Sequence, residues 1–253
     1  MAKTQLQVRF IEDEYNEIGI DEAGRGPVLG PLVVCSVAIP SDDVKQLIEI
    51  GVKDSKDLSA KKREEIKNWF LNNCESKGWS FSLVHCLPSR IDSAVNNKGL
   101  NILETELFAE SINQLDFKFK AKVNITCDAC DVDEQRFSRR VSQLIDGWPW
   151  KHSILNSYHK ADENYPVVGM ASILAKQARD DAVREIESEV GFPIGSGYPS
   201  DKKTIDAVKK MIGDKPHEQL RWSWSTVKRI WHEKHNCELP NRAVEDGNQT
   251  TLF

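Results

Sequence analysis

The chain has 253 residues, of which 40% are hydrophobic, and this length and composition suffice for a well-packed core. The net charge of −5 argues against a simple polyanion-binding protein, but two bound divalent cations would reduce it to about −1, so nucleic acid is not excluded. No apolar segment predicts a signal peptide or a membrane span, and six irregularly spaced cysteines predict reduced thiols, so we expect a cytoplasmic protein without a membrane partner.

The first part of the chain alternates between strand and helix patterns. Residues 17–21 and 31–39 have strand patterns, and the second is apolar on both faces, which predicts a position inside a sheet. Ser59 is a typical N-cap for a helix that ends at Gly78. Further along, the pattern predicts strands at 79–87, 122–128 and 153–158 and helices at 100–115 and 133–145.

The last third of the chain is predicted to be mainly helical. Pro166 begins a long helix that stops at Gly191, and the first half of this helix is apolar on nearly every side, which requires burial. Two more helices are predicted at 201–213 and 223–236. Strands interleaved with helices up to about residue 190 indicate an α/β core that is followed by a helical end.

The stretch GIDEAGRGPVLG, residues 19–30, contains two acids, glycines and an arginine directly after the first strand. It departs from the dinucleotide-binding fingerprint, because its third glycine is one position late, Pro27 interrupts it and a strand follows. Side chains of adjacent strand residues point to opposite faces. We therefore expect Asp21 and Glu22 to share a metal ion only if the chain turns out of the strand between them.

The glycines of this stretch suit a ligand as well as a turn. Gly24 and Gly26 would let main-chain amides approach a phosphate, and Arg25 has donors for one. Asp128 ends another predicted strand and Asp162 precedes the buried helix, and clefts in α/β proteins form at such positions. Four carboxylates offer the hard oxygen ligands of Mg²⁺ or Mn²⁺. From the pattern alone, a solvated acidic turn and ordinary cap or loop carboxylates remain alternatives.

Several longer motifs resemble one known family. The chain contains, in this order, GIDEAGRGPVLGPLVV, VKDSKDLSAKKRE, CDACDVDEQRF, HKADENYPVVGMASILAKQARD and GSGYPSD. With these motifs it resembles ribonuclease HII, the type 2 ribonuclease H, of the archaeal kind, from about Glu17 to His235. The resemblance implies an α/β fold of the ribonuclease H type, a mixed sheet flanked by helices with a helical C-terminal part. We expect a catalytic domain over residues 1–195, the helical part over 196–237 and a flexible tail over 238–253, in a monomeric protein.

The resemblance also implies a metal-dependent endoribonuclease with a role in DNA replication and repair. Such an enzyme hydrolyses RNA in RNA/DNA hybrids and incises at ribonucleotides embedded in duplex DNA, leaving 3′-hydroxyl and 5′-phosphate ends. In the two-metal-ion mechanism, two Mn²⁺ or Mg²⁺ ions activate a water and neutralise the leaving oxygen. The implied catalytic residues, which are also the metal ligands, are Asp21, Glu22, Asp128 and Asp162.

The same resemblance assigns substrate contacts. Gly24, Arg25 and Gly26 match the loop that holds the ribonucleotide. Tyr198 matches the tyrosine that packs against its sugar and helps to sense the 2′-hydroxyl. Contacts to phosphates fall on Ser55, Lys56, Lys176 and Arg179. On the residue pattern alone, the tyrosine also fits a half-buried packing residue and the last two cations fit a solvated helix face.

The chain departs from the family pattern at a few positions. Asp57 stands where the family usually has a second lysine, which weakens the case for a phosphate contact there. Gly169 and Met170 stand where serine and alanine are usual, and residues 146–153 resemble a small insertion. None of these departures removes an implied metal ligand.

Two cysteine motifs give competing signals. CDAC, residues 127–130, is a CxxC, which is typical of a redox pair or half a zinc site, but no second CxxC accompanies it. His232, His235 and Cys237 have ligand-like spacing without a fourth partner nearby in the sequence, and they suit the end of a surface helix.

Two alternative functions stay open. A non-catalytic duplex-binding or clamp-associated protein would bind a hybrid without turnover, and a junction resolvase of the same fold would cut DNA that lacks ribose. The final QTTLF has the Q-x-x-L-F form of peptides that dock on DNA sliding clamps, although the further aromatic pair of archaeal clamp peptides is absent. The candidate clamp contacts are Gln249, Leu252 and Phe253.

Overall fold

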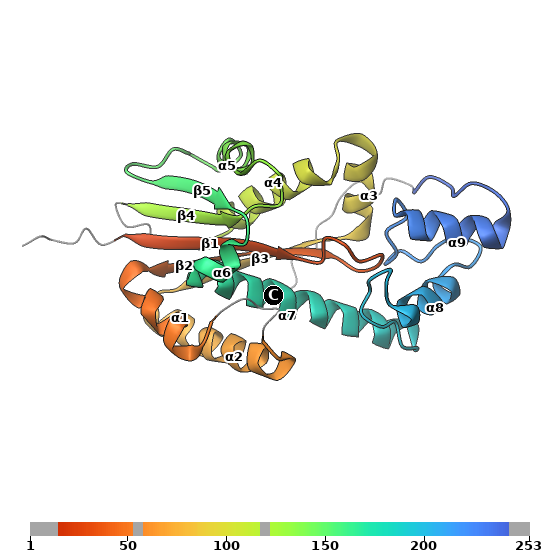
Figure 1. Ribbon diagram of the computed structural model, residues 1–253, viewed down its shortest axis with the longest axis horizontal. Helices are drawn as coiled ribbons and strands as arrows, with labels where there is room; N and C mark the ends of the chain where they lie inside the picture. The colour runs from red at the N-terminus through yellow and green to blue at the C-terminus, as the bar shows by residue number, and fades with distance from the viewer. Residues whose placement is uncertain (1–14, 53–57, 117–121, 243–253) are drawn as a thin grey trace, which may run out of the picture.

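A mixed sheet forms the centre of the computed structural model, which describes residues 15–52, 58–116 and 122–242 (Figure 1). The sheet has five strands in the order β3-β2-β1-β4-β5. β2 pairs antiparallel with both β1 and β3, whereas β4 runs parallel to β1 and β5 parallel to β4. The strands are β1 (Asn16–Ala23), β2 (Leu32–Pro40), β3 (Ser80–Cys86), β4 (Val123–Asp128) and β5 (Ile154–Tyr158). The predicted mixed sheet flanked by helices is confirmed.

Helices cover both faces of the sheet (Figure 1). α1, α2 and α7 pack on one face and α3, α4 and α5 on the other, while α8 and α9 lie beyond one end. None of the helices described has the length and apolar character that crossing a membrane requires. The helical bounds are η1 (Ser41–Asp43, a 3-10 turn), α1 (Val44–Ile50), α2 (Ala60–Lys77), α3 (Pro88–Asn97), α4 (Leu100–Asn113), α5 (Glu134–Ser142), α6 (Ala161–Asn164), α7 (Pro166–Val190), α8 (Lys202–Met211) and α9 (Ser225–His235).

β2 confirms the prediction of an interior strand. Leu32 and Val34 pack with the helices on one face, whereas Val33 and Cys35 pack with those on the other, and all four side chains are buried. Such a strand would expose apolar surface to water unless both of its faces were covered. Its continuous apolar run therefore predicted its place correctly.

The ends of the long helices follow their cap residues. The Ser59 side chain accepts a hydrogen bond from the Lys62 main-chain nitrogen at 3.2 Å, and α2 ends at Gly78, where φ is +64°. α7 ends at Gly191, where φ is +73°. Glycine adopts this left-handed conformation without a Cβ penalty. The strands and helices predicted from the sequence are present and differ only at their ends, whereas η1, α1, α3 and the one-turn α6 were not predicted.

α7 lies in close contact with β1 because Gly19 has no side chain. A Cβ built on Gly19 would lie 2.3 Å from the carbonyl carbon of Val167, in the first turn of the helix. Residues Val167 to Ala175 are all buried, as the apolar first half of the helix predicted. The close approach places α7 alongside the end of β1 that carries the first two acids.

The helical C-terminal part packs on the loop that follows β1. Val28 and Leu29 belong to one apolar cluster with Val208, Leu220 and Trp231. The backbone of the loop is tied to the same part, because Val28 N donates to Gly197 O at 2.8 Å. The glycine-rich loop is therefore fixed between the sheet and the C-terminal helices.

The first residues of the predicted tail also make contacts. The Glu238 carbonyl accepts a hydrogen bond from Trp231 Nε1 at 3.2 Å, and Arg242 Nη1 lies 3.0 Å from Asp92 Oδ2. Asp92 is itself buried in α3, so this ion pair holds the end of the described chain against the body of the protein.

Candidate functional site

Three of the four predicted acids converge at the ends of two neighbouring strands. One carboxylate oxygen from each of Asp21, Glu22 and Asp128 lies within 4.8 Å of the others. The first two acids come from β1 and the third ends β4, and these strands are parallel neighbours. Carboxylates at the same end of parallel strands are close in space although they are distant in the chain. These three acids are hereafter the carboxylate cluster.

The expected turn between Asp21 and Glu22 is absent, so that prediction was wrong. β1 continues to Ala23, which pairs with Val33 of β2. Oxygens of the two carboxylates nevertheless lie within 4.8 Å of each other, and Asp21 Oδ1 accepts a hydrogen bond from the Glu22 main-chain nitrogen at 2.7 Å. The two acids therefore come together without a turn of the backbone between them.

Asp21 lies in a strongly unfavourable electrostatic environment. Burial raises its pKa well above the usual range, and the charges of Glu22, Asp128 and Asp162 raise it further. A hydrogen bond from Ser172 of α7 opposes the shift. Crowded carboxylates with one buried member are stabilised when a cation neutralises them. This donor set, all carboxylate oxygens, fits hard divalent ions such as Mg²⁺ and Mn²⁺.

Asp162 lies close to the cluster without joining its tight group. It is only 4% exposed, and it belongs to α6 rather than to the loop we expected. Its charge acts on Asp21, but its oxygens are not among those that lie within 4.8 Å of one another in the described residues. Asp128 Oδ1 accepts a hydrogen bond from Ala161 N at 2.7 Å, which links β4 to α6. Its role as a metal ligand stays a prediction.

A buried arginine forms hydrogen bonds with the backbone of the loop after β1. Arg221 is 0% exposed, and its guanidinium donates to the carbonyls of Gly24 at 2.6 Å, Arg25 at 2.9 Å and Gly30 at 3.0 Å. Burial lowers the pKa of Arg221 to about 10, so the group stays cationic at neutral pH. Three carbonyls of one loop thus point inward to a single side chain. No local pattern in the sequence singled out this residue.

Gly24 needs to be glycine for two reasons. Its φ is +95°, and a Cβ there would lie 2.8 Å from the carbonyl oxygen of Pro31. L-residues with side chains rarely adopt this backbone conformation. The glycine therefore permits the bend that brings the loop over Arg221.

Tyr198 faces the other glycine of the loop. A Cβ on Gly26 would lie 3.4 Å from Tyr198 Cε1, and the tyrosine is 38% exposed. Trp224 Nε1 donates to the Gly26 carbonyl at 3.3 Å. The loop and the tyrosine ring thus stand opposite each other on the surface. The contact of Tyr198 with a ribonucleotide stays a prediction.

Arg179 positions Tyr198 and is not on a solvated face. Its residue is 5% exposed, its guanidinium lies 5.1 Å from the centre of the tyrosine ring, and Nη2 donates to Ser196 O at 2.6 Å. Nη1 also bonds Asp180. The alternative of a plain solvated face is therefore wrong for Arg179, whereas Lys176 keeps a side chain that is 29% exposed and lies 3.8 Å from Asp180.

Arg25 makes contacts inside the protein that the sequence did not suggest. Its Nη1 donates to Glu104 Oε2 at 2.6 Å and to Cys130 O at 3.0 Å, and Nη2 donates to Asn101 at 2.8 Å. Glu104 is fully buried, and burial outweighs the ion pair with Arg25, which raises the pKa of Glu104 to about 8. The guanidinium thus fixes the loop to α4. Phosphate binding by this side chain stays a prediction.

Several predicted residues lie outside the described part of the chain, and one neighbouring acid lies outside the cluster. Ser55 and Lys56, and also Asp57, lie outside the described residues, as does the QTTLF segment. Asp131 of the CDACD motif pairs with Arg136 and lies 3.5 Å from Arg140, and the hydrogen bond from Arg136 lowers its pKa. It thus remains outside the carboxylate cluster.

Glu104 is a residue that the sequence could have revealed. It lies on the apolar face of α4, with Leu103, Leu107 and Phe108, all of them buried. A lone acid in such a stripe is costly unless it is paired. From the sequence we predicted only the helix and did not single out this acid.

Comparisons with known proteins agree on one family. The model of the family described as Ribonuclease HII matches residues 18–227. The chain belongs to the ribonuclease HII family. It is accordingly a ribonuclease H, an endonuclease that hydrolyses RNA in RNA/DNA hybrids.

Individual relatives support the family assignment over most of the chain. A ribonuclease HII of Methanococcus maripaludis is 39% identical over 88% of this chain and 90% of its own. The crystal structure of ribonuclease H2 from Pyrococcus horikoshii has a TM-score of 0.73 at 32% identity and covers 86% of this chain and 98% of its own. The ribonuclease HII in a PCNA complex from Archaeoglobus fulgidus has a TM-score of 0.70 at 33% identity, over 87% and 98% of the two chains.

Proposed function

We propose that this ribonuclease HII also incises duplex DNA at single embedded ribonucleotides, leaving 3′-hydroxyl and 5′-phosphate ends by a two-metal-ion mechanism. The observation that supports this proposal is the position of the carboxylate cluster directly before a loop whose outer side faces Tyr198. A site that must recognise one ribose needs polar groups at the 2′-hydroxyl and a cation site at the phosphate. Both kinds of group are adjacent here.

The proposed metal ligands are Asp21, Glu22 and Asp128, with Asp162 assisting. Mg²⁺ and Mn²⁺ both suit carboxylate oxygens, and when bound they supply the Lewis acidity that activates water and stabilises the leaving oxygen. Asp21 is held by Ser172 and by the Glu22 backbone, so its orientation is set before a cation arrives. The Asp128 side chain is held by the amide of Ala161. These hydrogen bonds keep the oxygens in position.

The loop supplies the proposed contact to the ribonucleotide. Arg221 and Trp224 draw the carbonyls of Gly24, Arg25 and Gly26 to one side, which leaves the amides of the loop available to the substrate. Tyr198 offers a ring for the sugar and a phenol for its hydroxyl. Lys176 is the proposed phosphate contact, and Arg179 holds the tyrosine.

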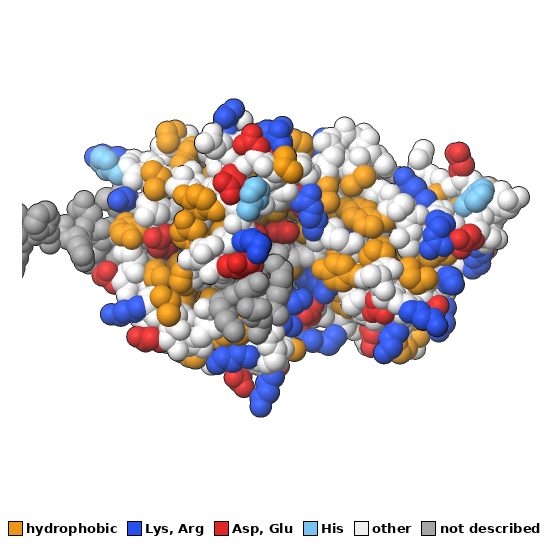
Figure 2. Space-filling view, in the orientation of Figure 1, with side chains coloured by type: hydrophobic (Ala, Val, Ile, Leu, Met, Phe, Trp, Pro, Cys, Tyr) orange, Lys and Arg blue, Asp and Glu red, His pale blue; other side chains and the backbone are white. Residues whose placement is uncertain are grey.

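Charge on the surface is consistent with local recognition. On the face shown in Figure 2, Lys and Arg side chains are interspersed with Asp and Glu. The net charge of the chain is −5. We therefore propose that affinity for the duplex comes from the loop, the cations at the cluster and a few phosphate contacts, which makes binding dependent on salt and on divalent metal.

A nicking assay tests this function. The substrate is duplex DNA with one ribonucleotide, incubated with Mg²⁺, with Mn²⁺ or with EDTA, and the nick and its ends are mapped. We expect a metal-dependent nick at the ribonucleotide, abolished by Asp128→Asn and retained in Glu64→Gln, which changes an exposed acid of α2. Binding without any nick, or cutting of the all-deoxy duplex, would contradict the proposal and favour a binding protein or a resolvase.

We further propose a tether to a DNA sliding clamp through Gln249, Leu252 and Phe253. The Archaeoglobus fulgidus relative is described in a complex with PCNA. In this chain Arg242, the last described residue, pairs with Asp92 of α3. Calorimetry with an archaeal clamp tests the tether. Loss of binding in Phe253→Ala with unchanged nicking of free duplex supports it, and undiminished binding contradicts it.

A further inference from the structure

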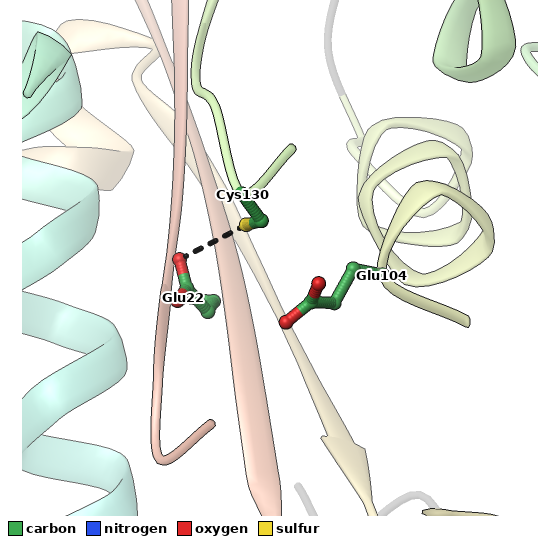
Figure 3. Close-up of side chains that lie close together, drawn as sticks. All are labelled: Glu22, Glu104 and Cys130. Carbon is green, nitrogen blue, oxygen red and sulfur yellow. Dashed lines mark hydrogen bonds between the residues drawn. The ribbon is translucent and has the colours of Figure 1, made fainter. Parts of the chain in front are cut away.

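A second group of metal-ligating side chains lies next to the carboxylate cluster. Ligand atoms of Glu22, Glu104 and Cys130 all lie within 4.8 Å of one another. The three residues come from β1, α4 and the segment after β4, and their side chains converge in one place (Figure 3). The group contains a sulfur, and Glu22 belongs to both groups.

Glu104 has a buried carboxylate oxygen whose hydrogen-bonding capacity is unused within the described part of the chain. It is 0% exposed, and its Oε2 accepts the hydrogen bond from Arg25. Its Oε1 is buried and has no hydrogen-bond partner among the described residues. Figure 3 shows its carboxylate on the side of the helix that faces Glu22 and Cys130. A buried carboxylate oxygen without a partner costs free energy, which a bound cation would offset.

Charge and distance both fit a divalent ion. Once a cation displaces the protons of Glu104 and Cys130, two carboxylates and a thiolate carry three negative charges and Arg25 carries one positive charge, so a divalent cation would leave the group neutral. In tetrahedral coordination by zinc, a sulfur and an oxygen ligand are roughly 3.6 Å apart. Cys130 Sγ donates a hydrogen bond to Glu22 Oε2 at 3.4 Å, so replacing this proton by a cation needs little change in the S···O distance. Glu22 and Cys130 are partly exposed, which gives an ion a route from solvent.

Arg25 holds two of the three ligands from outside the group. Its Nη1 bonds both Glu104 Oε2 and the Cys130 carbonyl. Because Oε2 is occupied in this way, the orphaned Oε1 is the oxygen left to bind a cation. Hydrogen bonds of this kind orient metal ligands in proteins.

We propose that Glu22, Glu104 and Cys130 bind a borderline-soft divalent cation of the zinc class. A thiolate favours zinc over magnesium, whereas the all-oxygen carboxylate cluster favours magnesium or manganese. Because Glu22 cannot serve both ions unchanged, zinc at this site inhibits hydrolysis supported by Mg²⁺. The inhibition rests on the proposed function of the cluster, but zinc binding does not. Cys127 takes no part, since it is fully buried in the core, so the site is not that of a CxxC motif.

Cobalt absorption tests the site without any activity measurement. Co²⁺ bound to a thiolate gives a charge-transfer band in the near ultraviolet that Zn²⁺ then removes. We expect the reduced full-length protein to show this band, Cys130→Ser to lose it and Cys237→Ser, which changes an exposed cysteine, to keep it. We expect Glu104→Gln to weaken Co²⁺ binding by about tenfold or more. No band in the wild type, or a band that persists in Cys130→Ser, overturns the proposal.

Zinc titration of the nicking reaction tests the inhibition. Each variant is compared with its own zinc-free rate in Mg²⁺. We expect Cys130→Ser to need about tenfold more zinc than the wild type or Cys237→Ser for half inhibition. Equal sensitivity of Cys130→Ser and the wild type would overturn the inhibitory role. If the wild type nicks nothing in Mg²⁺ or Mn²⁺, the proposed function fails, and the cobalt band still decides whether the site exists.

Discussion

The loop that follows β1 directly succeeds two acids of the carboxylate cluster, Asp21 and Glu22, but different interactions hold the cluster and the loop in place. The cluster gathers like charges, and its most buried member, Asp21, has a pKa that burial and neighbouring acids raise. The loop is satisfied from within, because Arg221 donates to three of its carbonyls. One region is thus destabilised until a cation binds, whereas the other is ordered by the protein itself.

This difference separates two tasks that one site must perform. A cation site without its ion contains negative charges that repel one another, because the same charges attract the ion. A loop that recognises a sugar needs a fixed backbone, because a misplaced group loses most of its effect. Substitutions in the two regions should therefore change different quantities, namely metal affinity in one and substrate affinity in the other.

The largest effect is expected for Asp21→Asn. If Asp21 is a metal ligand as proposed, hydrolysis should fall by more than the roughly 100-fold that residues behind a metal ligand contribute. The folded protein binds the Asp21 proton more tightly than the unfolded chain does, so the ionised group costs stability as pH rises above its ordinary pKa of about 3.9. In the absence of metal, Asp21→Asn should accordingly have a higher melting temperature than the wild type at neutral pH.

Calorimetric melting in EDTA and in Mn²⁺ measures both parts of this prediction. Mn²⁺ should raise the melting temperature of the wild type more than that of Asp21→Asn. At roughly 2–4 °C for each kcal/mol in a chain of this size, the difference is measurable. Equal or lower stability of the metal-free variant would show that Asp21 is not strained in the absence of cations.

The next effect is expected for Arg221→Met. It leaves the buried carbonyls of Gly24 and Gly30 and the partly buried carbonyl of Arg25 without this donor, and at about 1–3 kcal/mol for each buried group the free energy of unfolding should fall by at least about 2 kcal/mol. The catalytic efficiency on a single ribonucleotide should fall roughly 10–100-fold, mainly through KM. Mn²⁺ affinity, measured by calorimetry, should change little.

Milder variants keep this test valid if the methionine variant folds poorly. Arg221→Lys retains the charge but not the fork of donors, and it should recover part of the lost efficiency. Trp224→Phe removes the hydrogen bond to the Gly26 carbonyl and keeps a smaller ring beside Arg221, and it should raise KM a few-fold, at about 1 kcal/mol. A loss of kcat and Mn²⁺ affinity with unchanged KM would mean that the arginine supports the cluster instead of the loop.

The sequence predicted those parts of the fold that depend on local pattern. Ser59, Gly78 and Gly191 mark helix ends because capping involves only neighbouring residues. The apolar run of β2 predicted a strand covered on both faces. α3 was missed although the local signals were present, since Pro88 begins it and its buried apolar residues Ile91 and Ala94 have helical spacing.

The site was predictable only in part, for a related reason. The acids of β1 and β4 stand at strand ends, which is a local signal, and Tyr198 came from the resemblance. Arg221 lies 197 positions from Gly24, so nothing near either residue reports their contact. The ion pair between Arg25 and Glu104 likewise joins a loop to a helix 79 positions away. Long-range polar contacts of this kind require the structure.

A smaller effect is expected for Tyr198. Tyr198→Ala removes the ring that faces Gly26 and should lower the efficiency on a single ribonucleotide by about tenfold, equivalent to about 1.4 kcal/mol. Tyr198→Phe keeps the ring and its contact with Arg179, so its catalytic efficiency should fall only by the part that the hydroxyl contributes. Wild-type efficiency in Tyr198→Ala would support the alternative of a packing residue.

The smallest effect is expected for Lys176→Ala. Lys176 is partly exposed on α7, near Asp180, and removal of one phosphate contact should weaken hybrid binding about threefold at moderate salt. The slope of log affinity against log salt should fall by about one, equally for hybrids of any sequence. Lys209→Ala, which removes an exposed lysine of α8, is the matched control and should leave the slope unchanged. If both slopes stay at the wild-type value, Lys176 belongs to the solvated surface, and the phosphate contacts of the loop region must come from main-chain amides, as the ordered backbone above Arg221 would allow.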